Sequence, residues 1–391
     1  MVEVEVHKLA ESVKEQVIRW RRFLHQHPEL SFQEEKTAQF VYETLESFGN
    51  LELSRPTKNS VMARLIGKQP GKVLAIRADM DALPIEEAND VEYKSQNPGV
   101  MHACGHDGHT SILLGTAKVL STLQAEIKGE VRFLFQHAEE LAPGGAEEMV
   151  EAGVMEGVDM VIGQHLWSGL EAGLVGVTYG PATAAPDTFW ITIQGAGGHA
   201  AQPHETIDAI AIGAQVVTNL QHIVARNTNP LGRLVVSVTQ FHGGTTHNVI
   251  PGTVEMQGTV RSFDPEIRKH TAERMEQIVR GICEAHGATY TFRYEHGYRS
   301  VVNEERVTGA IEETMRELFG EQAIQHLDPN MGGEDFSAFQ QKAPGCFFFT
   351  GAGNAAKGIV HPHHHPNFDI DEESLEYGVK LFVGATFKLL A

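Results

Sequence analysis

The chain has 391 residues, of which 41% are hydrophobic and 21% charged, and its formal net charge at pH 7 is −20. This length exceeds what one hydrophobic core usually supports, so we expect two domains. The acidic balance excludes a general nucleic-acid partner, because no basic stripe is present to displace counterions from phosphates. The 3 cysteines do not form a disulfide framework and favour a reducing, cytoplasmic location. We expect no membrane partner, because the chain shows neither a signal-peptide pattern nor a membrane-length apolar run.

The first part of the chain alternates between helix and strand patterns. Apolar residues recur at helical spacing over residues 9–23, 37–48 and 110–123. Short apolar runs predict buried strands at residues 73–76, 131–135 and 160–162, the last ending before Gln164 and His165. Such alternation predicts an α/β fold, with a largely parallel sheet covered by helices on both faces. Polar residues that follow the strands should then meet at one edge, where ligands bind in open α/β sheets.

From about residue 185 the pattern changes to βαββαβ, which is the order of a ferredoxin-like unit. Its expected strands are 188–194, 234–240, 253–261 and 289–294, and its expected helices are 206–223 and 266–286. The α/β pattern then resumes with a helix at 307–319, a strand at 346–350 and a last helix at 372–390. We therefore expect a catalytic domain of residues 1–184 and 296–391, interrupted by an inserted α+β domain of residues 185–295.

Two groups of candidate metal ligands stand near the predicted strand ends. Cys104 and His106 flank a single glycine in a histidine-rich turn before a helix, and thiolate and imidazole are common zinc ligands. Glu139 and Glu140 follow the strand at 131–135. Adjacent side chains of an extended chain point apart, so one carboxylate can hold a metal while the other acts as a general base. Taken alone, this pair has a simpler interpretation as a solvated acidic loop.

Further histidines follow later in the chain. His165 comes after the next strand, and alone it would be interpreted as a structural residue. Residues 361–368 form a histidine-rich loop before the last helix. Together with the first two groups, these side chains exceed the four ligands of one tetrahedral ion. The sequence therefore predicts two ions that share a bridging ligand and activate water together.

Eight segments, in order over nearly the whole chain, resemble the aminoacylase/carboxypeptidase family of dinuclear metal amidohydrolases. The likeness is strongest to its branch of bacterial N-acyl-L-amino-acid amidohydrolases, hippurate hydrolases and auxin-conjugate hydrolases. The segments are RRFLHQHPELSFQE (21–34), AIRADMDALPI (75–85), MHACGHDGHT (101–110), FLFQHAEE (133–140), GAGGHAAQPH (195–204), HNVIPGTVEMQGTVRSF (247–263), MGGEDFS (331–337) and HHPNFDIDE (364–372).

The resemblance implies two divalent ions per subunit, with zinc favoured and manganese, cobalt or nickel as alternatives. It implies that the Cys104 thiolate bridges them and that Glu139 is the general base acting with a metal-bound hydroxide. It also implies that Asp81 orients a ligating imidazole, while the role of Asp79 stays open. The implied ligands are Cys104, His106, Glu140, His165 and His364.

The frame of the last ligand rests on a pattern, since three histidines are consecutive at residues 363–365. The family pattern His-x-Pro-x-Phe selects His364. A His364→Ala change that left metal and activity intact would move the assignment to a neighbour.

The resemblance also implies that the inserted domain is a lid that forms a homodimer or a higher homo-oligomer. His199, Asn248 and Arg261 are its candidates for contacts with the substrate carboxylate or the developing oxyanion, although His199 could be a structural loop residue. The implied reaction is hydrolysis of a small N-acyl amino acid to a carboxylate and a free amino acid. Alternatives are a carboxypeptidase or dipeptidase with the same dinuclear site, a carbamoyl-amide hydrolase, and a non-catalytic metal-binding protein.

Overall fold

The computed structural model describes residues 2–391 and divides into two compact units. Unit 1 contains the chain up to Ala182, together with Val301–Pro329 and Asp335–Ala391. Unit 2 contains Thr183–Ser300 and the short segment Asn330–Glu334. The boundaries expected from the sequence lie within a few residues of these, but residues 330–334 were expected in the catalytic domain and belong to unit 2.

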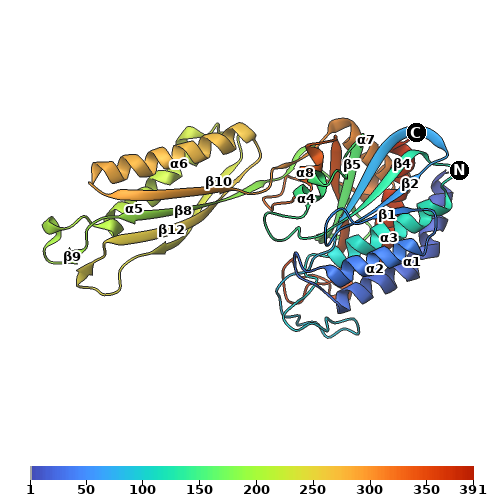
Figure 1. The fold of residues 1–391 in the computed structure, drawn as a ribbon, viewed down its shortest axis with the longest axis horizontal. Coiled ribbons are helices and arrows are strands. Elements are labelled where there is room, and N and C mark those ends of the chain that lie inside the picture. Colours follow the sequence, from blue (N-terminus) through green and yellow to red (C-terminus); the bar gives the residue numbers. More distant parts are fainter. Residues whose placement is uncertain (1) are drawn as a thin grey trace. The chain divides into compact units, whose positions relative to one another are not determined.

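Unit 1 is built on an 8-stranded sheet (Figure 1). Its four central strands run parallel, which confirms the expected largely parallel sheet, while antiparallel pairs occur on both sides of this centre. Across the sheet the strands are β1 (Glu52–Ser54), β2 (Val61–Ile66), β4 (Lys128–Gln136), β3 (Gln69–Asp79), β5 (Met160–Glu171), β16 (Gly345–Gly353), β6 (Val175–Val177) and β15 (Ile324–His326). A separate pair is formed by β7 (Gly180–Thr183) and β14 (Val301–Asn303).

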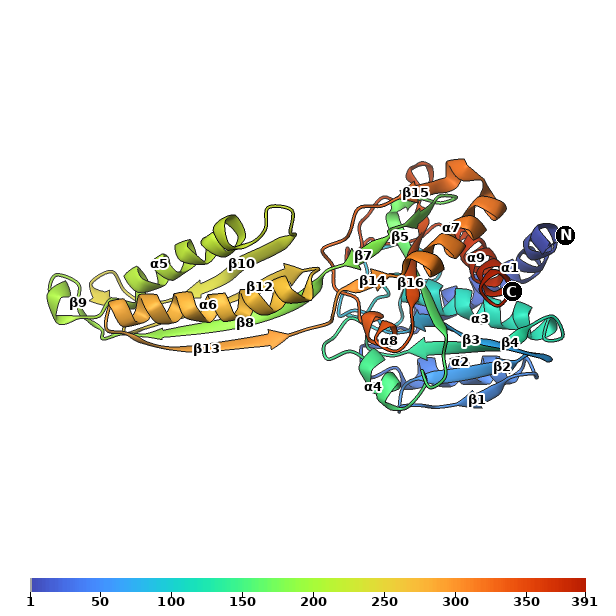
Figure 2. The ribbon, with the colours of Figure 1, turned by 90° about the horizontal axis from the view of Figure 1, so that it is seen from above.

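Helices cover both faces of this sheet because strand side chains alternate between the faces. In β4, Val131, Phe133 and Phe135 join one core, whereas Leu134 joins the other. The first core is completed by α1 (Val2–Gln26), α2 (Glu35–Glu46), α3 (His106–Thr122), α7 (Glu305–Phe319) and α9 (Glu373–Leu389) (Figure 2). The second core is completed by the shorter helices α4 (Ala146–Glu151) and α8 (Ser337–Gln340).

Unit 2 is a 4-stranded antiparallel sheet with two helices packed into a core of its own (Figure 1). In chain order its main elements are β8 (Ala185–Gln194), α5 (Ala209–His222), β10 (Leu234–His242), β12 (Thr253–Ser262), α6 (Pro265–Ala285) and β13 (Thr289–His296). Both helices begin with an aspartate cap, Asp208 and Asp264, whose carboxylates accept backbone N–H groups. A small two-stranded antiparallel sheet pairs β9 (Gly198–His199) with β11 (Val249–Ile250).

Short helical turns complete the described chain. They are 3-10 turns at Pro203–Glu205, Glu321–Ala323 and Ala355–Lys357 and a π-helical turn at Ile223–Asn227. Among the helices of residues 2–391, none combines the length and the apolar character needed to cross a bilayer.

Two elements differ from the sequence prediction in a way that bears on the site. The strand expected at residues 160–162 continues as β5 to Glu171, so His165 lies inside the strand. The parallel pairing of β16 with β5 supplies the hydrogen bonds for this extension. The helix expected from residue 110 begins at His106, directly after Gly105, whose φ of 90° closes the preceding turn.

Candidate metal centre

The five side chains expected to bind metal come together in unit 1. Cys104 lies in the turn before α3, His106 is the first residue of that helix, Glu140 follows β4, and His165 lies in β5. His364 comes from the loop between β16 and α9. The ligand atoms form two groups, Cys104 with His106 and His165, and Cys104 with Glu140 and His364, each with its atoms within 4.8 Å of one another. Cys104 is common to both groups, so its sulfur is placed to be shared between two ions.

Each of the two buried imidazoles has one nitrogen tied to the protein and the other turned toward this cluster. The Nδ1 of His106 lies 3.0 Å from the Asp81 carbonyl oxygen and 3.2 Å from its Oδ1. The Nδ1 of His165 donates to the Leu166 carbonyl at 2.7 Å, which leaves its Nε2 3.5 Å from Cys104 Sγ. Such hydrogen bonds fix the tautomer and the ring orientation of metal-binding histidines.

Asp81 links the His106 imidazole to the loop of Glu139 and Glu140, which we call the acidic loop. While its Oδ1 faces His106, its Oδ2 accepts the Ser31 hydroxyl at 2.7 Å and the backbone N–H of Glu140 at 3.0 Å. One buried carboxylate therefore orients two of the five candidate ligands. This contact pattern suits the supporting role that the resemblance implies for Asp81.

The cluster has an excess of negative charge in a buried setting. Burial disfavours protonation of His106, yet Asp79, Asp81 and Glu140 raise its pKa to about 10. Burial, together with the charges of Glu140 and Glu139, raises the pKa of the Cys104 thiol well above its usual value. A thiolate in this position therefore needs a cation beside it, as metal-binding cysteines do.

Two buried polar atoms indicate whether these residues fit divalent cations. The Nε2 of His106 and the Oε1 of Glu140 make no hydrogen bond within residues 2–391. These two atoms lie 3.8 Å apart. Because an unpaired buried nitrogen is costly, a cation beside the Nε2 of His106 accounts for that atom. The Oε1 of Glu140, which also faces the Nε2 of His364 at 3.2 Å, can bind the same ion. The donor set of thiol, imidazole and carboxylate suits zinc and related divalent ions.

His109 lies in the first turn of α3, as His106 does, but it is not available as a ligand. Its Nδ1 lies 2.6 Å from Asp79 Oδ1, and its Nε2 accepts the backbone N–H of Leu166 at 2.9 Å. Both ring nitrogens are therefore occupied. His109 holds the Asp79 carboxylate in place, and the second oxygen of that carboxylate lies 3.6 Å from the Nε2 of His106.

The three consecutive histidines have distinct surroundings. The Nε2 of His363 accepts the Ser168 N–H at 3.2 Å, and its ring stacks on Trp167. The Nδ1 of His365 accepts the Asn367 N–H at 3.0 Å. His364 has a φ of 66°, and its Nε2 lies 3.2 Å from Glu140 Oε1. Of the three, His364 is the one that reaches the acidic loop.

Arg77 was not singled out by the sequence analysis, although it lies beside the cluster. Its buried guanidinium contacts Asp79 at 2.8 Å, Gln136 at 2.7 Å and Asp335 at 3.0 Å. Burial opposes ionisation of Asp79, but Arg77 and the nearby histidines hold its pKa well below the usual value. A sequence signal existed, because Arg77 directly follows the apolar run at residues 73–76, within the buried part of β3.

A second buried charge network lies behind the first turn of α3. The fully buried Arg21 contacts Asp107 and Asp369, each at 2.8 Å. His25 connects Asp107 at 2.7 Å to Glu87 at 3.2 Å. Asp107 directly follows His106, so this network anchors the helix start that carries a candidate ligand.

The three candidate residues of unit 2 do not form one cluster. His199 and Asn248 are neighbours at the two-stranded β9–β11 sheet, where both are exposed and the backbone oxygen of Asn248 accepts the Ala200 N–H at 3.1 Å. Arg261 lies near the other end of β12, a strand of 10 residues that spans about 30 Å. Within unit 2, Arg261 is therefore distant from the other two.

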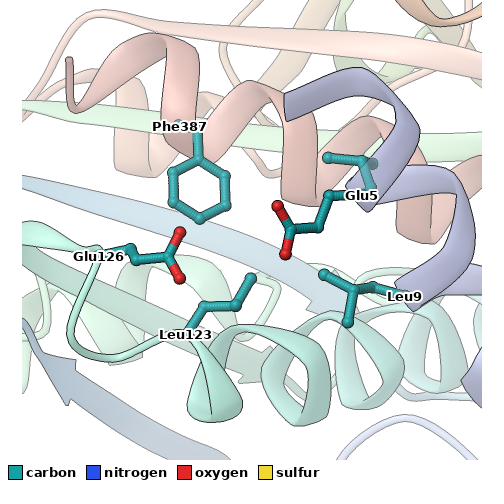
Figure 3. A pocket seen from close by; sticks show the side chains of 6 residues that line it. Glu5, Leu9, Leu123, Glu126 and Phe387 are labelled. Atoms are coloured by element: carbon teal, nitrogen blue, oxygen red, sulfur yellow. The ribbon is translucent and has the colours of Figure 1, made fainter. Parts of the chain in front are cut away.

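A small pocket elsewhere in unit 1 lacks this chemistry (Figure 3). It lies beyond the C-terminal end of α3, about 25 Å along the helix from His106. Two exposed glutamates and hydrocarbon side chains line it, with none of the candidate ligands: Glu5, Val6, Leu9, Leu123, Glu126 and Phe387.

Comparisons with known proteins show which family the chain is similar to. The sequence model of Peptidase family M20/M25/M40 matches residues 75–388. The N-acyl-L-amino acid amidohydrolase of Geobacillus stearothermophilus is 70% identical over 303 residues, which cover 78% of this chain and 82% of that protein. Thermostable carboxypeptidase 2 of Saccharolobus solfataricus is 44% identical over 379 residues, covering 95% and 96%. A crystal structure of a dinuclear metal binding peptidase of the M20 family from Bacillus subtilis matches with a TM-score of 0.85 and 38% identity, covering 97% and 99%.

Proposed function

Since the chain belongs to peptidase family M20/M25/M40, we propose that it hydrolyses N-acyl amino acids to a carboxylate and a free amino acid. The family resemblance predicted from the sequence is confirmed, and the chain is a hydrolase that acts on amide bonds. One observation carries the proposal. Thiol, imidazole and carboxylate groups form two ligand groups that share Cys104, with the Glu139 carboxylate beside them.

Two divalent cations would be held by this cluster, with Cys104 shared between them. When bound, the cations polarise the amide carbonyl and make water nucleophilic at neutral pH. We favour zinc because of the thiolate, with manganese, cobalt and nickel as alternatives. The ligands in this proposal are Cys104, His106, Glu140, His165 and His364.

Glu139 supplies the proton transfer in this mechanism. Its carboxylate is buried and lies within 4.8 Å of ligand atoms of His106 and Glu140. It takes a proton from the attacking water while the new bond between that oxygen and the carbonyl carbon forms. It then returns the proton to the amide nitrogen as the C–N bond breaks, so one water is consumed and no other reactant is needed.

The residues of unit 2 receive a supporting role in the proposal. His199 and Asn248 lie together at the small β9–β11 sheet, where both are exposed and would donate to the oxyanion or bind the substrate carboxylate. Arg261 is a separate candidate for the carboxylate. We propose that unit 2 also joins two chains in a homodimer or larger assembly. The cysteines are all free, which suits the cytoplasmic location predicted from the sequence.

A carboxypeptidase acting on unblocked peptides is the second candidate. It is favoured by the 44% identity to thermostable carboxypeptidase 2 over nearly the whole chain. The same metal cluster and the same base would serve both reactions, because both break an amide bond. The two differ in whether the substrate carries a free amino group.

Purified protein assayed against N-acetyl-methionine, hippurate and Ala-Gly would test the proposal. Each substrate is assayed as prepared, after chelator treatment, and after add-back of zinc, manganese, cobalt or nickel. Metal-dependent release of the amino acid from the blocked substrates alone is the expected result. Cleavage of Ala-Gly alone would establish the carboxypeptidase alternative, and turnover that survives complete metal removal would contradict both.

A further inference from the structure

The loop that carries Glu139 and Glu140 is held by a carboxylate on each side. The backbone N–H of Glu140 donates to Asp81 Oδ2 at 3.0 Å. On the other side, the backbone N–H of Ala138 donates to Glu34 Oε1 at 2.7 Å. Glu139 lies between these two tethered amides. Its side-chain direction therefore depends on both bonds.

The backbone at Ala138 needs such a tether. Its φ is 50°, in the left-handed region that residues with a Cβ rarely adopt. Conformations of this kind persist where surrounding contacts hold them, and they occur often at functional sites. The Gly145 N–H also bonds the Ala138 carbonyl at 3.0 Å. The bond from Gly145 holds the carbonyl of Ala138. The bond to Glu34 holds the Ala138 N–H, which faces the side of the chain that comes from β4.

Glu34 is itself fixed in position for this task. It is fully buried, its Oε1 also accepts the Phe32 N–H at 3.1 Å, and its Oε2 accepts the Asn59 side-chain amide at 3.2 Å. Burial and the charge of Asp81 raise the pKa of Glu34 to about 7. The site thus keeps a carboxyl group where its ionisation is disfavoured. This favours a role as a hydrogen-bond acceptor over a role as a charge.

We propose that Glu34 is a positioning residue that aims the Glu139 carboxylate by accepting the backbone N–H of Ala138. It does not touch the reacting atoms and acts through the loop backbone. The inference rests on the proposed function in one respect, since it takes Glu139 as the general base. The hydrogen bond between Glu34 and Ala138 does not depend on that assignment.

Two conservative variants separate the acceptor from the charge. Glu34→Gln keeps an oxygen at the same reach, and Asn59 can rotate its amide to pair with the new NH2 group, because its Oδ1 has no hydrogen-bond partner within the described residues. Glu34→Asp keeps the charge but shortens the side chain by one methylene, which withdraws the oxygen from Ala138. Glu35→Gln is the matched control, since Glu35 is exposed and pairs with Lys58.

The kinetic result expected is a fall of kcat in Glu34→Asp by about 10- to 100-fold, with KM changed by less than about 2-fold, because a displaced base slows chemistry more than binding. Glu34→Gln should keep kcat within about 3-fold of the parent, and the control Glu35→Gln should have the kcat of the parent. Metal content is measured in every variant and should not change. The proposal is overturned if Glu34→Asp keeps the parental kcat, or if Glu34→Gln loses as much as Glu34→Asp with its ions bound.

Hydrogen exchange of the metal-free protein gives a second readout. The Ala138 amide should exchange faster in Glu34→Asp than in the parent and remain protected in Glu34→Gln. Equal protection in all three would contradict the tether whatever the activity. If the parent itself hydrolyses no amide in a metal-dependent way, the proposed function fails, while the exchange data still decide whether Glu34 holds the loop.

Discussion

The candidate residues of unit 1 and those of unit 2 differ in how firmly they are held. His106 and Asp81 are buried, and each is tied by more than one hydrogen bond or ion contact. His199 is exposed, and its ring accepts one backbone N–H, that of Ala201 at 3.0 Å. Preorganised groups stabilise a transition state without further reorganisation, whereas exposed groups must be ordered when substrate binds. We therefore expect unit 1 to set the chemical step and unit 2 to tune it.

The largest effect on this difference between the units is expected from neutralising Glu139, the proposed base in unit 1. Glu139→Gln should lower kcat by about 100- to 10,000-fold, because the amide cannot take a proton from water. Both ions should remain bound, because the five proposed ligands are untouched. Kinetics together with metal analysis check this, with Glu151→Gln at the exposed end of α4 as the control. A kcat within about 10-fold of the parent would remove Glu139 from this role.

The next largest effect concerns the stability of unit 1. Arg21→Met should lower the free energy of unfolding by about 3–5 kcal/mol, because it leaves the Asp107 carboxylate buried without its main partner. The control is its neighbour, since Arg22 is 42% exposed and pairs with Glu372. Arg22→Met should cost less than about 1 kcal/mol. Denaturant unfolding of the chelated protein measures both, and equal losses would contradict the importance of burial.

The same network predicts a pH dependence. Burial opposes ionisation of Asp107, yet Arg21 and His25 hold its pKa well below the usual value. A depressed carboxyl pKa stabilises the fold above the unfolded-state pKa of about 4, and this stabilisation is lost as the pH falls further. The difference in unfolding free energy between the parent and Arg21→Met should therefore be largest at neutral pH and shrink below about pH 4. A constant difference across that range would exclude Asp107 as its source.

A comparison inside the histidine run sharpens the metal assignment. His364→Ala should weaken binding of one ion by at least about 100-fold, because it deletes a proposed ligand. His365→Ala should leave both affinities within a few-fold, since its ring faces Asn367 and stacks on His361. Titration of the chelated protein with zinc distinguishes the two. Similar losses in both variants would mean that the loop, rather than one imidazole, holds the ion.

The smallest effect is expected in unit 2. His199→Ala should lower kcat/KM by about 10-fold, or about 1.4 kcal/mol, with no change in metal content. The loss is modest because the exposed ring must be ordered during turnover, which offsets part of its contribution. Steady-state kinetics on the blocked substrates provide the measurement. An unchanged kcat/KM would show that His199 is a structural loop residue with no part in turnover.

The sequence predicted the local parts of the metal cluster better than the distant ones. Cys104 and His106 share one turn, so their spacing alone indicated a common ion. His364 could be selected only through a family pattern, because residues 363–365 are chemically identical. Its distinction comes from two long-range contacts, the bond of its N–H to the Ala103 carbonyl and the approach of its ring to Glu140.

The supporting residues escaped prediction for the same reason. Glu34 meets Ala138 from 104 positions away, and Arg77 meets Asp335 from 258 positions away. Neither pairing produces a periodic or local signal in the sequence. The same limit applies to the fold. The long apolar strands and the amphipathic helices were predicted because their patterns are local. Strands of 3 residues at the sides of the sheet, such as β1 and β15, are too short to carry a period.

The position of β16 in the sheet has a consequence for biosynthesis. This strand lies between β5 and β6, yet it begins at Gly345, 170 residues after β6 begins at Val175. The sheet of unit 1 therefore stays divided until β16 has been made, while almost all of unit 2 is one continuous stretch of chain. Local contacts form faster than distant ones. During synthesis, the inserted unit should thus become compact first, and the half-made catalytic unit should be the part that depends on chaperones.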